Sequence, residues 1–467
     1  MKRVMGLAAS AACVAVAACG GSGNGNGASD VPRVFDPFPS TYQAYPSQTT
    51  LLTGATVIDG AGALIEGAGV LIENGVIRAV GADLTAPEGA RVIDAAGKWI
   101  TPGIIDNHSH LGVYPSPGVP AHSDGNEISG PVTAEVWAEH SVWPQDPGFT
   151  RALAGGVTSL TILPGSANLF GGRGVTLKNV PARTVQEMKF PGAPHTLKMA
   201  CGENPKRVYG YGRGVVPGGA PYTRMGNVAG YRDAWIKASD YKKKWDAFID
   251  GNGDAPARDL ELETLAAALS GDILVHMHCY RADEMALILD LSEEFGYHVA
   301  SFHHAVESYK IADMLADYGT CSSMWADWWG FKMEAYDGIP ENIPMVHAAG
   351  ACAIVHSDSP VGIQRLNQEA AKAWADGRRA GIDVPIETAW QWLSLNPARS
   401  LGIADRTGSL EPGKMADVVV WSANPFSVYA QAEQVYIDGA LMYDRNDPAY
   451  QPVMDFELGQ PGEGDRK

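Results

Sequence analysis

The stretch Thr101-Pro-Gly-Ile-Ile-Asp-Asn-His-Ser-His-Leu-Gly112 organises the whole chain. It opens with the turn dipeptide Pro102-Gly103, continues as an apolar strand and ends with His108 and His110. Because side chains alternate along a strand, histidines two residues apart face the same side. Residues 112–118 are rich in Gly and Pro and cannot continue a strand, so the pair lies at the strand's C-terminal end. Two neutral imidazoles there make half of a metal site, although so short a pair also arises by chance.

Length and charge limit the classes of protein that fit. The 467 residues suffice for two or three domains or for one large barrel with additions, and 45% of them are hydrophobic. Lys and Arg number 35 against 53 Asp and Glu, a formal charge of −18. This negative excess repels phosphate backbones, so we predict a partner that is a small-molecule substrate and not a nucleic acid.

Residues 1–19 have the pattern of a lipoprotein signal peptide. A positive start at Lys2 and Arg3 precedes an apolar segment that is too short to span a membrane. Val16-Ala-Ala-Cys19-Gly20 resembles the lipobox of bacterial lipoproteins, in which the cysteine becomes the lipidated first residue. Residues 20–49 are predicted as a flexible linker. We therefore expect a protein of the bacterial cell envelope, periplasmic and held to the membrane only by a lipid at Cys19. The alternative is an ordinary secretory signal cleaved nearby.

The other cysteines carry no metal-binding spacing. Cys201, Cys279, Cys321 and Cys352 lie singly in apolar segments, which predicts buried free thiols. An oxidising periplasm would permit a disulfide, but the sequence does not pair them.

The order of strand and helix patterns predicts an α/β protein with two structural units. Residues 50–102 and 401–445 are rich in short β-runs, and we expect both chain ends to form one small β-sandwich. Asn74-Gly75 is a type I′ hairpin signal. Residues 103–400 alternate strands with helices, which predicts a (β/α)8 TIM barrel. The competing doubly wound sheet lacks a GxGxxG motif after a first strand. Residues 446–467 are predicted as a poorly ordered tail.

The barrel elements can be placed by their apolar patterns. Predicted strands are Ile104–His108, Val157–Leu163, Gly174–Leu177, Leu197–Ala200, Ile273–Cys279, His298–His304, Thr320–Met324 and Ala353–Ser357. Predicted helices are Ala229–Ile249, Leu260–Leu269, Asp283–Phe295, Ser308–Tyr318, Asn367–Ala380 and Pro385–Ser394.

Further metal-binding residue types stand at later strand ends. His276 and His278 share one face of their strand, and His278 lies nearer its C-terminal end. His303 and His304 are adjacent and must point opposite ways, so only one of them can face the barrel axis. Asp358 ends another strand, just before a proline, and a buried carboxylate there needs a partner such as a metal.

These motifs resemble the amidohydrolase superfamily, and within it the imidazolonepropionase-related and prolidase-like hydrolases. The resemblance covers nearly everything from Leu51 to Arg445. It is carried by Gly54-Ala-Thr-Val-Ile-Asp59, by Trp99-Ile-Thr-Pro-Gly-Ile-Ile-Asp-Asn-His-Ser-His110, and by Gly408-Ser-Leu-Glu-Pro-Gly-Lys-Met-Ala-Asp-Val-Val-Val-Trp421. It implies a distorted barrel with a metal at the C-terminal face of the strands.

The resemblance also implies a ligand set, residue by residue. The first-strand pair is matched by His108 and His110, the fifth-strand ligand by His278, the sixth by His304, and the metal-binding proton shuttle by Asp358. His276 and His303 become neighbours of these ligands. Two-metal members bridge their ions with a carboxylated lysine or a glutamate from the fourth strand. Lys198 and Glu203 are the candidates, with Lys198 preferred, and without either the site holds one ion. Zn²⁺ suits this set, and Mn²⁺ or Fe²⁺ are alternatives.

The predicted activity is hydrolysis of a non-peptide C–N bond, such as that of a cyclic amide, by metal-activated water. Asp358 and His304 are the predicted catalytic residues. The alternatives are a prolidase-like metallodipeptidase and a catalytically silent surface binding protein. Self-association into a homo-oligomer is left open. Predicted substrate-binding residues are Arg207, Arg213, Arg224 and Trp325, with surface arginines and packing as the competing interpretations.

Overall fold

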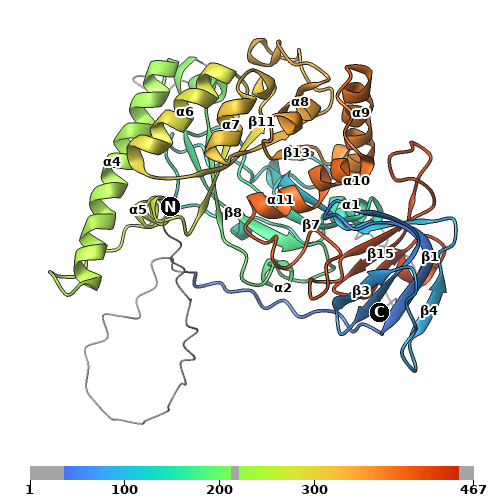
Figure 1. Cartoon of the computed structure of the whole chain (residues 1–467). Coiled ribbons are helices and arrows are strands. Elements are labelled where there is room, and N and C mark those ends of the chain that lie inside the picture. The colour runs from blue at the N-terminus through green and yellow to red at the C-terminus, as the bar shows by residue number, and fades with distance from the viewer. Residues whose placement is uncertain (1–35, 212–219, 452–467) are drawn as a thin grey trace, which may run out of the picture.

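The computed structural model describes residues 36–211 and 220–451. It has two parts, a strand barrel enclosed by helices and a separate sheet that packs beside it (Figure 1). The signal peptide, Cys19, Arg213 and residues 452–467 lie outside the described residues. Within the described ranges, no helix combines the length and the apolar character needed to cross a membrane.

The barrel is an eight-stranded sheet whose strands follow one another in sequence order from β6 to β13. No ladder joins β6 to β13 among the described residues, but the backbone N–H of Asp358 donates to the carbonyl of His108 across the gap (3.0 Å). The result is a nearly closed barrel of the TIM type. Its strands are β6 (Ile104–Ser109), β7 (Val157–Ile162), β8 (Phe170–Lys178), β9 (Thr196–Ala200), β10 (Leu274–Cys279), β11 (Val299–His304), β12 (Cys321–Met324) and β13 (Ala353–Val355).

One strand departs from the regular alternation. The strand β8 is antiparallel to both β7 and β9, whereas the other barrel pairs are parallel. Only residues 163–169 separate β7 from β8, and no helix forms there. A parallel return needs a crossover of a dozen or more residues, so the chain turns back as a hairpin. The barrel is therefore distorted, and the ends of β6, β9, β10, β11 and β13 meet at one rim.

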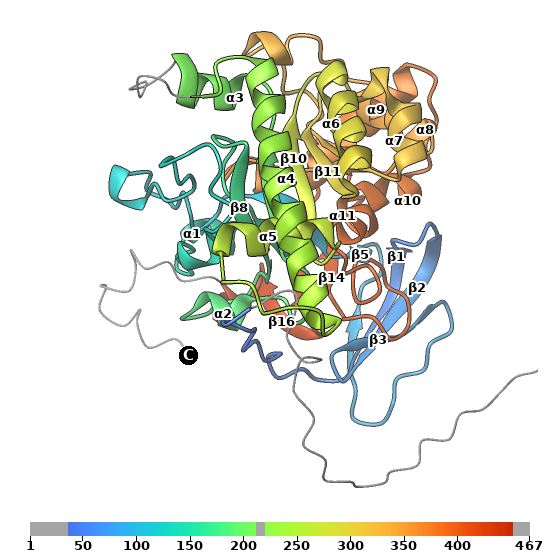
Figure 2. The same cartoon turned by 90° about the vertical axis from the view of Figure 1, so that its left-hand side faces the viewer.

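Helices cover the outside of the barrel, and Figure 2 shows α4 running along one side of it. Several predicted helices are confirmed within a few residues, and α5 has the predicted bounds. The side chain of Asp259 caps the N-terminus of α5 by accepting a hydrogen bond from the backbone N–H of Leu262 (3.0 Å). Their bounds are α1 (Pro147–Ala154), α2 (Val185–Met188), α3 (Glu203–Pro205), α4 (Arg224–Ile249), α5 (Leu260–Leu269), α6 (Ala282–Phe295), α7 (Ala312–Tyr318), α8 (Asn342–Ala348), α9 (Leu366–Arg379), α10 (Ile386–Ala389) and α11 (Leu395–Ser400).

Both chain ends build a second sheet, as predicted. All eight strands are hydrogen-bonded into one sheet, so a sandwich of two separate sheets is not confirmed. Asn74 and Gly75 both have positive φ, which is the conformation that a type I′ turn requires. The strands are β1 (Thr50–Ile58), β2 (Leu64–Glu73), β3 (Val76–Gly81), β4 (Arg91–Asp94), β5 (Trp99–Pro102), β14 (Val418–Trp421), β15 (Ala432–Ile437) and β16 (Ala440–Asp444).

Residues 36–49, predicted as part of a flexible linker, are instead fastened to the body of the protein. The Ser40 hydroxyl donates to the carbonyl of Lys189 (2.6 Å), and the Tyr45 hydroxyl donates to that of Pro181 (2.7 Å). The carboxylate of Asp36 pairs with the Lys189 ammonium (2.7 Å). The linker prediction was wrong for this part, because polar side chains far along the chain provide partners that composition does not reveal.

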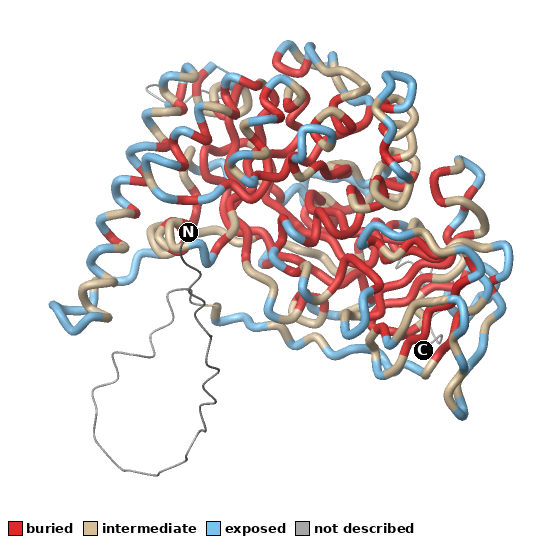
Figure 3. The backbone as a smooth tube through the Cα atoms, in the orientation of Figure 1, coloured by how far each residue is buried: buried red, intermediate tan, exposed pale blue. Residues whose placement is uncertain are grey.

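Buried residues are concentrated on the strands of the barrel and of the second sheet. Figure 3 shows buried backbone through the barrel strands and much of the second sheet, with exposed residues on the outer helices. Where the two parts meet, the fully buried Lys178 ammonium lies 3.0 Å from the Asp417 carboxylate and 2.9 Å from that of Asp438. Such a charge is tolerated in the interior only with partners of this kind.

Candidate metal centre

The predicted ligands converge at the rim of the barrel although they come from five strand ends. His108 Nε2 lies 3.1 Å from Lys198 Nζ and 3.5 Å from the Asp358 carboxylate. His110 Nε2 lies 3.1 Å from the same carboxylate, and His304 Nε2 lies 3.8 Å from it. The ring of His278 is 4.6 Å from that of His304, centroid to centroid. His108, His110 and Asp358 form a group whose ligand atoms could hold a metal ion.

An unusual backbone conformation directs the side chains of His304 and Asp358 towards the other predicted ligands. His304 has φ of 71° and Asp358 has φ of 48°, the left-handed region that non-glycine residues rarely adopt. Such strain gathers at functional sites. It also corrects the expectation that only one of the adjacent histidines faces the barrel axis. Because His304 leaves the extended conformation, its ring and that of His303 both reach His108, with centroids 4.9 and 4.6 Å away.

A conflict between lone pairs indicates a cation. His110 Nδ1 lies 2.8 Å from the carbonyl of Leu163, and since a carbonyl only accepts, Nδ1 carries the proton. In the neutral ring His110 Nε2 is then bare, and it faces an oxygen of Asp358 at 3.1 Å. Two acceptors at that distance need a proton or a metal ion between them. Imidazoles with a carboxylate are the donor set of a zinc-type site, so these residues fit such an ion.

The fourth-strand lysine lies inside the group and the glutamate does not. Lys198 is fully buried beside His108, and burial lowers the pKa of its amine to about 7. Glu203 lies at the start of α3, where its carboxylate is 3.8 Å from the Lys332 ammonium. A buried amine in contact with a histidine of the cluster and under the influence of Asp358 is an unusual arrangement, and it makes Lys198 the preferred candidate of the two.

Asp358 stays ionised among these groups. Burial on its own would raise the pKa of its carboxyl, but His110 and Lys198 beside it hold that pKa below the usual value. A quarter of the side chain remains exposed to solvent. Asp358 is therefore a carboxylate that an incoming molecule can reach.

Three supporting residues were not found from the sequence. The buried Asp106 accepts from the Ser357 hydroxyl and from the backbone N–H of Ser357 (3.2 Å), and it thereby ties β6 to the segment before Asp358. Burial raises the pKa of the Asp106 carboxyl to about 7. His356 Nε2 lies 3.1 Å from His304 Nδ1. The one available signal was spacing, because His356 precedes Asp358 by two residues, as His108 precedes His110.

An aromatic wall extends outward from His304. The rings of Trp325 and Tyr280 both stack on the His304 imidazole, with centroids 4.4 and 5.2 Å away. Phe331 touches both outer rings, and 59% of it is exposed. The Trp325 indole N–H donates to the carbonyl of Ser357 (3.0 Å), which fixes the wall against the segment that carries Asp358. Trp325 thus has a definite place beside the centre.

A cavity of about 700 Å³ opens beside the ligands. Two lining residues adjoin them: the Tyr114 ring lies 5.7 Å from that of His110, and the Asn204 amide lies 3.3 Å from His278 Nε2. Arg207, on a π-helical turn over Lys206–Tyr211, also lines this cavity. Arg224 does not; its guanidinium is bound between the carboxylates of Glu284 (2.8 Å) and Glu334 (2.9 Å).

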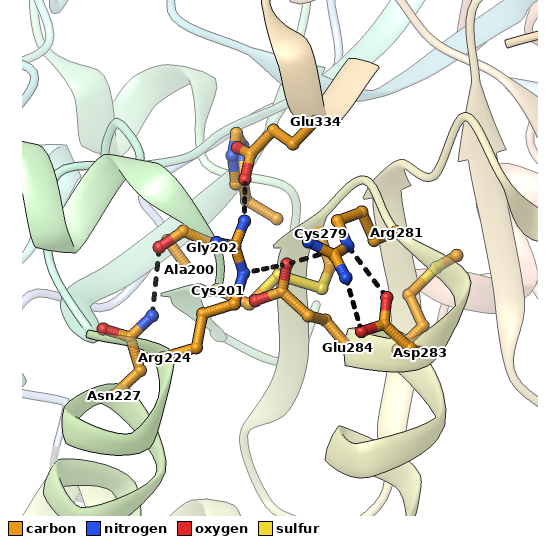
Figure 4. Close-up of a disulfide and its surroundings, with 12 residues drawn as sticks. Ala200, Cys201, Gly202, Arg224, Asn227, Cys279, Arg281, Asp283, Glu284 and Glu334 are labelled. Carbon is orange, nitrogen blue, oxygen red and sulfur yellow. Dashed lines mark hydrogen bonds and ion pairs between the residues drawn. A yellow bond between two sulfur atoms is a disulfide. The ribbon is translucent and has the colours of Figure 1, made fainter. Parts of the chain in front are cut away.

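Two disulfides correct the expectation of free thiols. Cys201–Cys279 joins the ends of β9 and β10, beside the ion pairs of Arg224, as Figure 4 shows. Cys321–Cys352 joins the starts of β12 and β13 at the opposite ends of their strands. Each pair is separated by tens of residues, so only the parallel strand order brings the sulfurs together.

Comparison with known proteins agrees with the family resemblance that the sequence motifs indicate. A model described as the Amidohydrolase family matches residues 99–442. The amidohydrolase tasK of Hapsidospora irregularis is 35% identical over 380 residues, which are 77% of this chain and 38% of that relative, so the chain spans well under half of its length. The imidazolonepropionase of Mesorhizobium japonicum is 24% identical over 384 residues, which are 78% of this chain and 87% of that relative.

Solved structures support the fold. An amidohydrolase from Thermotoga maritima MSB8 superimposes with a TM-score of 0.77 at 37% identity, over 85% of this chain and all of that one. A prolidase complexed with N-methylphosphonate-L-proline reaches a TM-score of 0.51 at 17% identity, over 85% and 100% of the two chains, a likeness of fold alone.

Proposed function

Since this chain belongs to the amidohydrolase family and is a metal-dependent hydrolase, we propose that it hydrolyses a non-peptide C–N bond of a cyclic amide. The observation that carries the proposal is the Nε2 of His110 facing the carboxylate of Asp358 at 3.1 Å, an arrangement that a metal ion bound by both would satisfy. The proposed ligands are His108, His110, Lys198, His278, His304 and Asp358.

A bound metal ion and the side chains of the protein would contribute different parts of the reaction. A bound Zn²⁺, or Mn²⁺ or Fe²⁺ in its place, would lower the pKa of water and polarise the scissile carbonyl. Asp358 accepts the proton of the attacking water and passes it to the leaving nitrogen. It suits both steps because it is ionised and reachable from solvent. His304 is held beside it by the stacked Trp325, so its ring keeps one orientation during the reaction.

The shape beside the centre supports a ring-shaped substrate. A flat ring can lie along the wall of Tyr280, Trp325 and Phe331. The cavity lined by Tyr114 and Asn204, next to His110 and His278, has room for substituents. Arg207 offers a guanidinium at that cavity for a substrate carboxylate. The imidazolonepropionase relative is named for a cyclic substrate, which favours the same class.

A substrate panel tests the proposal directly. Hydantoins, lactams, imidazolones and Xaa-Pro dipeptides would be offered to the zinc-loaded protein, and ring opening followed by chromatography. We expect hydrolysis of one or more cyclic amides, and its loss when the metal is removed with a chelator. Cleavage confined to dipeptides would favour the prolidase-like alternative, and a protein that binds no metal would contradict the enzyme assignment.

We further propose that Lys198, carboxylated on Nζ by CO2, would help the histidines and Asp358 to hold two ions. Its amine is fully buried 3.1 Å from His108 Nε2, whereas the Glu203 carboxylate faces Lys332. Elemental analysis after dialysis should find two ions per chain in the wild type and at most one in Lys198→Ala. The matched variant Glu203→Gln should keep both. Loss of an ion from Glu203→Gln alone would assign the bridge to the glutamate.

The cell envelope remains our proposed location, with a lipid at Cys19 as the membrane anchor. Two disulfides support an oxidising compartment, because they are rare in a reducing cytosol. Fatty-acid labelling of the wild type and of Cys19→Ser would test the anchor: label retained by the variant would argue against it.

A further inference from the structure

Three histidine rings form an unbroken chain from the barrel core to the metal centre. His276 Nε2 lies 3.1 Å from the backbone carbonyl of Ser400, on α11. His276 Nδ1 lies 2.8 Å from His303 Nε2, and His303 Nδ1 lies 3.0 Å from His108 Nδ1. All three side chains have no exposed surface. No part of the hydrolytic step described above uses His276 or His303.

The backbone carbonyl of Ser400, at one end of the three histidine rings, sets the direction of every hydrogen bond between them. A carbonyl only accepts, so His276 Nε2 carries a proton and its Nδ1 is bare. His303 Nε2–H then donates to His276 and leaves His303 Nδ1 bare. His108 Nδ1–H donates in turn to His303. The bare nitrogen that remains is His108 Nε2.

This direction requires that each ring holds one proton. Each of the two ring–ring contacts has room for a single proton, and one N–H on each ring supplies it. The contact of His108 with Lys198, at the other end of the three rings, supports the same proton positions independently. Lys198 Nζ, which has protons to donate, lies 3.1 Å from His108 Nε2, so that nitrogen is an acceptor there.

We propose that His276 and His303 are positioning residues that hold His108 in the Nδ1–H tautomer, so that its Nε2 lone pair points permanently at the metal. The proposal rests on the proposed function, in which His108 is a ligand. Metal ligands are commonly oriented by a carboxylate or a carbonyl on their second nitrogen. Here the carbonyl lies two rings away, and the intervening imidazoles transmit its polarity.

The hydrogen-bonded series His276–His303–His108 is called the relay below. Zinc affinity, measured by competition with a chelating indicator, tests its role without any substrate. His303→Leu leaves His108 Nδ1–H without an acceptor, and we expect affinity to fall about 10- to 100-fold. His303→Asn returns an oxygen acceptor near the same position and should restore most of it. His276→Phe should weaken binding as well. In the double variant His276→Phe/His303→Leu, the second change should add nothing, because the chain is already broken.

The outcomes separate the relay from the proposed function. Wild-type affinity in His303→Leu, or losses that multiply in the double variant, would overturn the relay. Undiminished zinc binding by His108→Ala would overturn the proposed ligand set instead. Should a variant fail to fold, ¹⁵N NMR of the histidine rings in the metal-free wild type decides: a proton on His108 Nδ1 supports the relay, and a proton on Nε2 contradicts it.

Discussion

Asp358→Asn should reduce kcat by about 10²- to 10⁴-fold at saturating zinc and substrate, the range expected when a general acid–base group is removed. The amide is nearly the same size and still offers an oxygen, but it cannot take a proton from water. The wild-type carboxylate is ionised, partly exposed and 3.1 Å from His110 Nε2, so its protonation is the step that the variant loses. Steady-state kinetics on the substrate identified by the panel measure the change.

Metal content decides how that loss is interpreted. Elemental analysis of Asp358→Asn should find zinc retained through the histidines when zinc is in excess. Asp283→Asn provides a matched control, because Asp283 pairs with Arg281 on the surface at the same end of the barrel (2.8 Å). It should keep full activity. A retained kcat in Asp358→Asn with metal bound would contradict the proton shuttle.

The barrel was predictable from sequence because its signals are local. Apolar runs alternating with amphipathic ones set the strands, and the strand ends carry the histidines and Asp358. The strand β8 was predicted in part, at Gly174–Leu177, but its antiparallel direction was not, because only the short connection 163–169 reverses the chain. Local pattern gives an element's existence, and connection length gives its direction.

Apart from Glu203, the predicted ligand candidates come together in the structure, but the residues that support them could be found only from the fold. His304 and Asp358 depend on left-handed backbone that no residue preference indicates, because neither is a glycine. Asp106 and Ser357 meet across the barrel seam, 251 residues apart in the chain. The fastened segment 36–49 was hidden for the same reason, since its partners lie far along the sequence.

The Cys201–Cys279 disulfide should matter for the metal centre as well as for stability. It crosslinks β9 and β10 one residue beyond His278 and three beyond Lys198. Replacing both cysteines by serine should lower the free energy of unfolding by about 4 kcal/mol in the chain-entropy model. It should also weaken zinc binding about tenfold, as loss of a group supporting metal ligands does. Urea unfolding and chelator competition measure the two effects.

The second disulfide separates these effects. Cys321–Cys352 also crosslinks two adjacent barrel strands, and because the entropic term grows only with the logarithm of loop length, its removal should cost about the same stability. It lies at the strand starts, away from the ligands, so zinc affinity should stay at the wild-type value. Equal loss of affinity in both double variants would show that the metal centre responds to global stability, and the specific role of Cys201–Cys279 would then be wrong.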